Sequence, residues 1–223
     1  MRAAVIAVLG AESTGKTQLC EALARHWTAA GRRAVMVGEV LREFCVAQGR
    51  TPRQDEQLGI ALEQSRRIEA AAEAHELVVA DTTALMPAIY SRHYFSDHSL
   101  MERARAAMRI VRHSLVMGLD LPWVADGIMR EGAHMQARVD ADVRQALGDW
   151  GLSYSVISGR GPSRCEMALA ACEMALRDDA ARAPRSWRWV CADCDDSPSS
   201  LCELHERRLL RSASHLVDPP GPA

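Results

Sequence analysis

The chain has 223 residues, of which 48% are hydrophobic and 25% charged, a composition typical of a globular protein with one ordinary domain and an appendage. Its formal net charge of −2 gives no electrostatic reason to expect nucleic acid or an anionic membrane surface as a partner. No apolar run approaches the roughly 18 residues that a membrane-spanning helix needs. Seven cysteines, an odd number, and no recognisable export signal favour a reducing compartment, so we expect a cytoplasmic protein.

Short apolar runs and longer helical patterns alternate along the chain. The runs that predict strands are 3–9, 33–38, 76–80, 113–119 and 153–158. The segments that predict helices are 16–30, 54–74, 99–112, 136–149 and 162–177. The apolar runs do not alternate with polar residues, which indicates strands covered on both faces. This order predicts an α/β protein of three layers with a five-stranded, mainly parallel sheet.

The composition changes near Ala183 and Pro184, and this change predicts the domain limits. Residues 1–183 are expected to form the α/β domain. Residues 184–210 are rich in Trp, Cys and turn residues and predict a small Cys/His-rich appendage. Residues 211–223 have little to bury and predict a disordered tail.

Residues 10–17 read GAESTGKT and match the phosphate-binding pattern G-x-x-x-x-G-K-[ST] in full. The match follows an apolar run and precedes a predicted helix, as the pattern requires. The backbone N–H groups of such a loop point at phosphate oxygens, and the helix adds its positive N-terminal end. Lys16, the only lysine of the chain, predicts a compact charge on the β- and γ-phosphates, because the broad arginine fork does not fit inside the closed loop. Thr17 offers its hydroxyl to Mg²⁺.

Acidic residues follow two further strands, at the edge of the sheet where ligands bind. Asp81 comes after the run 76–80 and is suited to hold Mg²⁺, directly or through water, with the capping of a helix as the alternative. Glu39 comes after the run 33–38 and is suited to accept a proton from a hydroxyl, while Arg42 holds an anionic group nearby. The alternative for Glu39 and Arg42 is an ordinary charged helix start.

Two later segments carry arginines that could reach the same edge. The first reads DLPWVADGIMR at 120–130 and is followed by Arg138. Arg130 and Arg138 would neutralise charge in a transition state, with plain surface charges as the alternative. The second, GRGPSR at 159–164, would pass beside an adenine, although Arg164 fits a surface charge at a helix start equally well.

Four motifs in this order, GAESTGKT (10–17), GEVLREF (38–44), VVADTT (78–83) and DLPWVADG (120–127), resemble the ribosylnicotinamide kinase domain of the NadR family. The resemblance covers roughly residues 3–175. It implies a P-loop kinase of the deoxynucleoside-kinase-like type, which uses ATP and Mg²⁺ and belongs to NAD metabolism.

The resemblance implies a role for each matching residue. The ATP site would contain Gly10, Ala11, Glu12, Ser13, Thr14, Gly15, Lys16, Thr17 and Gln18. Thr17 and Asp81 would hold magnesium. The acceptor would contact Glu39, Arg42, Phe44, Trp123 and Asp126. The catalytic residues would be Lys16, Glu39, Asp81, Arg42, Arg130 and Arg138, with Glu39 as the first choice of base and Asp81 as the second.

The chain departs from the family pattern at two places. Gly38 and Val40 flank Glu39, where family members have aromatic side chains that stack on the nicotinamide ring. Met129 stands where the family has an arginine, and Arg130 follows one position later. The acceptor identity is therefore left open, with ribosylnicotinamide as the leading candidate.

The C-terminal segment contains four soft metal ligands at zinc-like spacing, with the alternative of a mobile tail with incidental thiols. They are Cys191, Cys194, Cys202 and His205. Four protein ligands leave no open position, so we expect a structural rather than a catalytic Zn²⁺. Acidic residues lie between the arginines of this segment, which argues against nucleic acid as its partner. We expect this segment to dock on a protein partner or to mediate self-association.

The sequence as a whole predicts an ATP-dependent kinase that phosphorylates a hydroxyl of a nucleoside-like small molecule to give, for ribosylnicotinamide, nicotinamide mononucleotide. The alternatives are an ATPase of the AAA type whose acceptor is water, and a nucleotide-sensing module that acts through its zinc knuckle on a protein partner.

Overall fold

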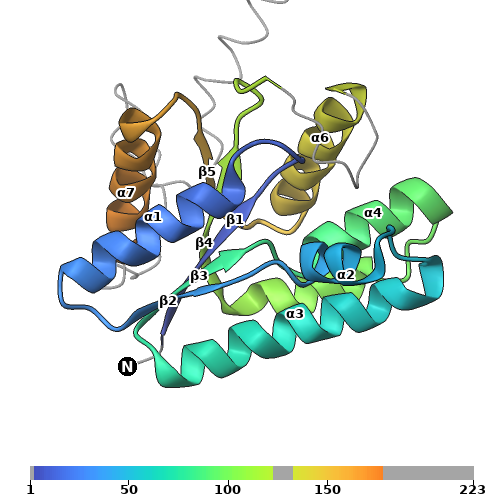
Figure 1. Ribbon diagram of the computed structural model, residues 1–223, viewed down its shortest axis with the longest axis horizontal. Helices are drawn as coiled ribbons and strands as arrows, with labels where there is room; N and C mark the ends of the chain where they lie inside the picture. Colours follow the sequence, from blue (N-terminus) through green and yellow to red (C-terminus); the bar gives the residue numbers. More distant parts are fainter. Residues whose placement is uncertain (1–2, 123–132, 178–223) are drawn as a thin grey trace, which may run out of the picture. The chain divides into compact units, whose positions relative to one another are not determined.

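A computed structural model describes residues 3–122 and 133–177, which form one sheet flanked by helices (Figure 1). The strands are β1 (Ala4–Leu9), β2 (Ala34–Val37), β3 (Leu77–Asp81), β4 (Val111–Met117) and β5 (Tyr154–Ile157). They form a five-stranded sheet in the order β2-β3-β1-β4-β5, and every neighbouring pair is parallel. The α/β class with a parallel sheet is therefore confirmed.

The helices of the described residues cover both faces of this sheet. They are α1 (Lys16–Ala29), α2 (Val40–Gln48), α3 (Gln54–Ala74), α4 (Leu85–Phe95), α5 (Met101–Ala107), α6 (Ala133–Asp149) and α7 (Pro162–Arg177), with a 3₁₀ turn, η1, at Met108–Ile110. Leu23 of α1 and Ala168 of α7 share one buried cluster with Ile6 and Leu115 of the sheet. The other helix layer, from α2 to α6, packs on the opposite face (Figure 1).

The strand order places β1 at the centre: the chain passes from β1 to β2 and β3 on one side of it and then crosses to β4 and β5 on the other side. In the register of the β1–β3 pair, Val8 lies opposite Asp81, so β3 ends in an acidic residue at the same level as the end of β1. Ligands of open parallel sheets bind outside the carboxyl ends of the strands at such a reversal. The fold therefore directs attention to the residues that follow β1, β2 and β3.

Two helices, α2 and α4, were not predicted from the sequence. Helix α4 is buried on nearly every side, from Leu85 to Ser91, and contains Pro87, so it has no polar face and no helical periodicity. Helix α2 has only nine residues and begins directly after the acidic residue Glu39. The structure thus supports the alternative that Glu39 stands at a helix start, since Glu39 is the N-cap residue of α2.

The end of the predicted helix 99–112 was also wrong. The α-helix stops at Ala107, and β4 begins at Val111, two residues before the predicted strand. Val111 is half-buried and packs against two of the hydrophobic clusters, so burial in the sheet decides its conformation rather than the helical pattern before it. The predicted limits at 183/184 and 210/211 lie outside the described residues.

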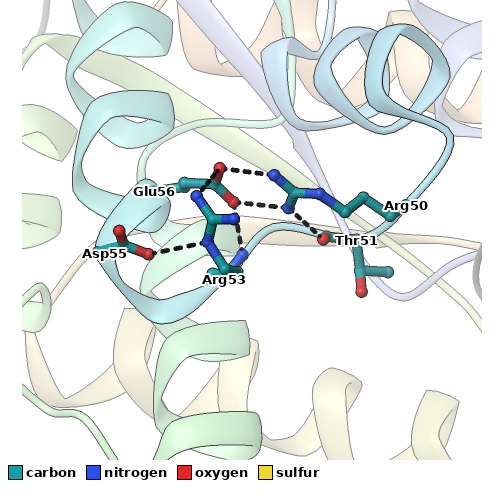
Figure 2. A network of polar contacts seen from close by, with 5 residues as sticks. All are labelled: Arg50, Thr51, Arg53, Asp55 and Glu56. Carbon is teal, nitrogen blue, oxygen red and sulfur yellow. Dashed lines mark hydrogen bonds and ion pairs between the residues drawn. The ribbon is translucent and has the colours of Figure 1, made fainter.

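The connection between α2 and α3 is held by charged side chains near its surface (Figure 2). Glu56 accepts two hydrogen bonds of 2.7 Å from Arg50 and one of 2.9 Å from Arg53, and it also accepts the backbone N–H of Arg53. These contacts lower the pKa of Glu56 to about 2, chiefly through the Arg50 hydrogen bonds. Arg53 is the residue before α3, so this network fixes the point at which the long helix begins.

In the part of the chain that the structure describes, no helix is long and apolar enough to cross a membrane.

Candidate active site

The loop between β1 and α1 takes a shape that depends on its glycines. Gly10 has φ of 142°, and a Cβ at this position would lie 3.1 Å from the Cβ of Met117 in β4. Gly15 has φ of 79° and is the residue from which α1 starts. A side chain would be strained at either position. The loop thus curls tightly over the end of the sheet, with the N-terminus of α1 at its open side.

Two side chains of the loop bond to one carbonyl. The hydroxyl of Thr14 and the ammonium group of Lys16 each donate a hydrogen bond of 2.8 Å to the carbonyl oxygen of Ala11. Lys16 is 9% exposed, so its charge lies inside the loop rather than in solvent. A compact ammonium with rotatable donors suits this closed space.

Helix α6 supports the same loop from the other side. Gln136 donates a hydrogen bond of 2.7 Å to the carbonyl oxygen of Glu12, and its side chain is buried. Sequence reasoning missed this residue, because a glutamine near the start of a predicted helix has no pattern of its own. The contact joins residues 124 positions apart.

Asp81 faces the start of α1 from the end of β3. The Thr17 hydroxyl donates a hydrogen bond of 2.6 Å to Oδ2 of Asp81, whereas Oδ1 is buried and has no hydrogen-bond partner in the part of the chain that the structure describes. Asp81 is 1% exposed. Burial raises the pKa of its carboxyl group, and the Thr17 hydrogen bond and the charges of Lys16 and Arg42 oppose that increase. Asp81 does not cap α4, which begins at Leu85, so that alternative is wrong.

The turn after Asp81 is unusual for its residue type. Thr82 has φ of 68°, a conformation that a β-branched residue rarely adopts, and its N–H donates to the carbonyl oxygen of Val8. The hydroxyl of Thr83 then accepts the N–H of Leu85 at 3.2 Å, where α4 starts. Strain of this kind is tolerated where the surroundings fix the backbone, and here the hydrogen bond from Thr82 to Val8 holds the turn directly after Asp81.

Glu39, at the end of β2, is held from both sides by one glutamine. Oε1 of Gln64 in α3 accepts the N–H of Val40 at 2.8 Å, and Nε2 donates to the carbonyl oxygen of Gly38 at 3.2 Å. Gln64 is 1% exposed. It therefore positions the backbone on either side of Glu39, and sequence reasoning missed it because a glutamine inside a helix-forming stretch looks like an ordinary helix residue.

Electrostatic effects on one buried thiol show that these groups converge. Burial raises the pKa of Cys20 in α1, and the charges of Asp81 and Glu39 raise it further while Lys16 lowers it. Charges act on a thiol over several ångströms, so these three side chains lie in the same region around Cys20. The ends of β1, β2 and β3 thus bring one cation and two carboxylates to the same edge of the sheet.

The remaining predicted residues are only partly placed. Arg42 is exposed on α2 and acts on the charge of Asp81, so it lies near the same edge. Phe44 is half-buried against the core of the α2–α6 layer, and its ring lies 5.4 Å from the guanidinium carbon of Arg50. Arg138 is exposed on α6.

Several of the predicted site residues lie outside the part of the chain that the structure describes. They are Trp123, Asp126 and Arg130 and the four predicted zinc ligands Cys191, Cys194, Cys202 and His205. Within residues 3–122 and 133–177, no group of three or more His, Cys, Asp or Glu side chains could hold a metal ion.

A small cavity of about 140 Å³ opens beside the loop, between α1 and the start of α7. Its walls include Gly15, Gln18, Leu121, Arg160 and Arg164. Arg164 is 6% exposed, so the alternative of a surface charge is wrong. Gln18, by contrast, is exposed on α1 at the rim of this cavity. Pockets that hold a complete drug-sized ligand measure about 300–1,000 Å³. The smaller volume of this cavity therefore suits a single ring system.

Solved structures share this fold at low sequence identity. A NadR protein in complex with NAD and AMP-PNP matches with a TM-score of 0.61 and 22% identity over 77% of this chain and 49% of that one. A NadR protein in complex with NR gives a TM-score of 0.62 and 21% identity, over 77% of this chain and 50% of the other. The chain thus spans about half the length of these NadR structures.

A thymidylate kinase from Ehrlichia chaffeensis matches over its full length, with a TM-score of 0.56, 14% identity and 79% of this chain covered. Sequence comparison with curated proteins found no match. A sequence family described as "AAA domain" matches residues 5–164, which contain the loop 10–17 and all five strands except the first residue of β1. The chain therefore has the P-loop NTPase fold and belongs to this AAA domain family.

Proposed function

We propose that the protein is an ATP- and Mg²⁺-dependent kinase that phosphorylates a hydroxyl group of a nucleoside-like small molecule, with ribosylnicotinamide as the first acceptor to test. The observation that carries this proposal is the 2.6 Å contact between Thr17 and Asp81 directly behind the phosphate-binding loop, with Glu39 at the end of the neighbouring strand. A simple nucleotide-binding module has no need for a second carboxylate at this place.

The phosphates of ATP would lie in the loop 10–17, where backbone N–H groups and the N-terminus of α1 face them. Lys16 bonds to Ala11 within the loop and would exchange that contact for the β- and γ-phosphate oxygens. The base would occupy the cavity between α1 and α7, where Gln18 stands at the rim.

Thr17 and Asp81 fit the donor set that Mg²⁺ takes in kinases. This ion keeps several waters and binds through one or two carboxylate or hydroxyl oxygens together with substrate phosphates. Oδ1 of Asp81 is buried and no described residue donates a hydrogen bond to it, so it can accept a bond from the ion or from its water. When bound, the ion supplies charge neutralisation on the transferring phosphate.

Glu39 would accept the proton from the acceptor hydroxyl. Gln64 fixes the backbone on both sides of this residue, which limits the positions that its side chain can take. Asp81 is the weaker candidate for the base, because its one hydrogen-bonded oxygen already faces Thr17 and its burial suits an ion ligand. Arg42 would stabilise the charge that passes between donor and acceptor.

Two features support the nucleoside class of acceptor. The fold is shared with a NadR structure that contains NR and with a thymidylate kinase. The sequence motif GEVLREF at 38–44 also resembles the acceptor side of the ribosylnicotinamide kinases. Contacts that stack on a nicotinamide ring would have to come from residues other than Gly38 and Val40.

The test is ADP release from ATP and Mg²⁺ with a panel of nucleosides that includes ribosylnicotinamide, with Lys16→Ala as the blank. We expect at least one nucleoside to raise the rate well above the rate with water, and mass spectrometry to find its monophosphate. The same low rate with every nucleoside would contradict the kinase and favour an ATPase whose acceptor is water.

A further inference from the structure

Arg164 is a buried cation for which the proposed phosphoryl transfer has no use. It lies in the first turn of α7, and its Nη2 atom donates hydrogen bonds. Nε and Nη1 are buried and have no hydrogen-bond partner among residues 3–122 and 133–177. Leaving donors of a charged group unsatisfied in the interior is unfavourable, so this position requires a reason.

The contacts of Nη2 tie together three places along the chain. Nη2 donates to the carbonyl oxygens of Gly118 at 3.3 Å and Ile157 at 3.4 Å, and it lies 3.4 Å from Oδ1 of Asp120. Gly118 follows β4 and Ile157 ends β5, so one guanidinium group joins the ends of two neighbouring strands. Burial lowers the pKa of Arg164, and Asp120 opposes that change.

Asp120 completes the connection through its other oxygen. Oδ2 of Asp120 accepts the backbone N–H of Gly159 at 2.7 Å. Gly159 has φ of 94°, so the loop between β5 and α7 turns sharply at the residue that Asp120 holds. A single aspartate thus fixes both the side chain of Arg164 and the backbone of the loop 158–161.

Arg164 of this pair belongs to the wall of the cavity beside the phosphate-binding loop, and Asp120 lies next to that wall in the sequence. Arg164 itself lines the cavity, together with Arg160 and Gly161 from the loop that Asp120 holds. Leu121, the neighbour of Asp120, lies on the same wall and is 3.5 Å from the position of a Cβ on Gly15. A change in the Asp120–Arg164 contact would therefore move two sides of the cavity without touching Lys16, Thr17 or Asp81.

We propose that Asp120 and Arg164 are positioning residues that hold the loop 158–161 against residues 118–121 and thereby set the affinity of this cavity for the base of the donor nucleotide. The pair acts on the base and not on the phosphates. The proposal rests on the proposed function in one respect, since it takes the ligand of the loop 10–17 to be a nucleoside triphosphate.

Arginine suits this role better than lysine. Its rigid planar group carries Nη2 one bond farther from the backbone than the nitrogen of a lysine and holds it in a fixed direction, where it meets two carbonyls and a carboxylate. The ammonium group of a lysine lies on a shorter, flexible stem and would not keep the same position among the three acceptors. Arg164→Lys should therefore behave like Arg164→Gln rather than restore the affinity.

The experiment measures equilibrium binding of ATP and of inorganic tripolyphosphate, each with Mg²⁺, to the full chain and its variants. Tripolyphosphate has the phosphates but no base. For Arg164→Gln we expect the affinity for ATP to fall about tenfold, which corresponds to one hydrogen-bonding contact of ordinary strength, and the affinity for tripolyphosphate to change by less than about twofold. An equal loss for both ligands, or no loss for ATP, would overturn the proposal.

Two further variants test whether the residues work as a pair. Asp120→Asn keeps an oxygen for the N–H of Gly159 but removes the charge that faces Arg164, so ATP affinity should fall by about threefold. The double variant should lose no more than Arg164→Gln alone, because residues of one network are not additive. Fully multiplicative losses would show that the two residues act independently and would refute the pair.

The controls separate this inference from a defect in folding and from the proposed function. Arg177→Gln removes an exposed arginine from the same helix and should leave both affinities unchanged. Retained tripolyphosphate binding shows that the variant is folded, and Asp120→Asn carries the test alone if Arg164→Gln does not fold. The binding measurement needs no acceptor. A failed phosphoryl transfer would therefore contradict the proposed kinase activity without changing the binding result for Asp120 and Arg164.

Discussion

The two sides of the candidate site are constructed in different ways. On the donor side, residues 10–17, the bonds that shape the loop join neighbours along the chain, such as Thr14 and Lys16 to the carbonyl oxygen of Ala11. On the acceptor side, residues 38–64, Glu39 depends on Gln64, which is 24 positions from Val40 and 26 from Gly38. The donor side is defined mainly by local conformation, with one distant hydrogen bond from Gln136 of α6, whereas the acceptor side exists only when α3 packs beside β2.

This difference has a functional consequence. A phosphate-binding loop can keep its shape while the rest of the site changes, because its geometry is local. The acceptor side can change its selectivity through helix packing without any change in the loop. The following predictions test this division, from the largest expected effect to the smallest.

Glu39→Gln should separate the two sides most clearly. Removal of the proposed base should lower the rate of phosphate transfer by about 10²–10⁴-fold, whereas the dissociation constant of ATP should stay within about twofold of the unchanged protein. Single-turnover kinetics and ATP binding measure the two quantities. Glu76→Gln changes an acidic residue just before β3, at the opposite edge of the sheet, and should have the activity of the unchanged protein. An unchanged transfer rate in Glu39→Gln would move the role of base to Asp81.

Lys16→Arg should damage the donor side although it keeps the charge. The broader guanidinium group does not fit where the ammonium group of Lys16 contacts Ala11, so we expect a loss of about 10²–10³-fold in turnover. Steady-state ADP release with and without nucleoside measures this effect. Activity close to that of the lysine form would mean that the loop is more open than its contacts indicate.

Gln64→Ala should weaken the acceptor side and the fold together. It leaves the N–H of Val40 and the carbonyl oxygen of Gly38 without partners, which should cost about 1–3 kcal/mol in the free energy of unfolding. Urea unfolding measures that value, and transfer kinetics should show a lower kcat with an ATP affinity that stays the same. Gln48→Ala, at the exposed end of α2, is the matched control. If ATP affinity falls as much as kcat, the two sides are not independent.

Asp81→Asn should abolish Mg²⁺-dependent turnover and yet stabilise the ligand-free protein. Burial raises the pKa of Asp81 in the folded state, so the folded protein binds more protons than the unfolded chain, and stability decreases as the pH rises through the raised pKa. The asparagine removes this cost, and we expect a higher melting temperature at pH 7 and no difference near pH 3. Thermal unfolding across pH 3–8 tests this. An equal or lower melting temperature of the variant at pH 7 would contradict it.

Glu56→Gln should have the smallest effect, since the network of Arg50, Arg53 and Glu56 is near the surface (Figure 2). The pKa of Glu56 is lowered to about 2, so the stability from its charge is present above the ordinary glutamate range, near 4.5, and is lost as the pH falls toward 2. We expect a slightly lower melting temperature at pH 7 and no difference at pH 2 or in high salt. A large decrease at pH 7 would show that the start of α3 depends on this network.

The parts that could be predicted from the sequence are those with local causes. The phosphate-binding loop, α3 and the strand ends at Glu39 and Asp81 follow from residue types and spacing, and the structure places them as expected. Helix α4 was not predictable, because a helix buried on all sides has no periodic pattern. A related reason explains why sequence reasoning missed three other residues, Gln64, Gln136 and Cys20. Each of them interacts with residues that are distant in the sequence.

The hydrogen bond between Gln136 and the carbonyl oxygen of Glu12 has a thermodynamic consequence. It makes the position of α6 and the conformation of the phosphate-binding loop two coupled variables. Linkage then requires reciprocity: if a ligand that displaces α6 changes the loop's affinity for phosphate by some factor, phosphate binding changes the affinity for that ligand by the same factor. One neutral side chain thus gives two parts of the chain that are far apart in sequence a coupling free energy.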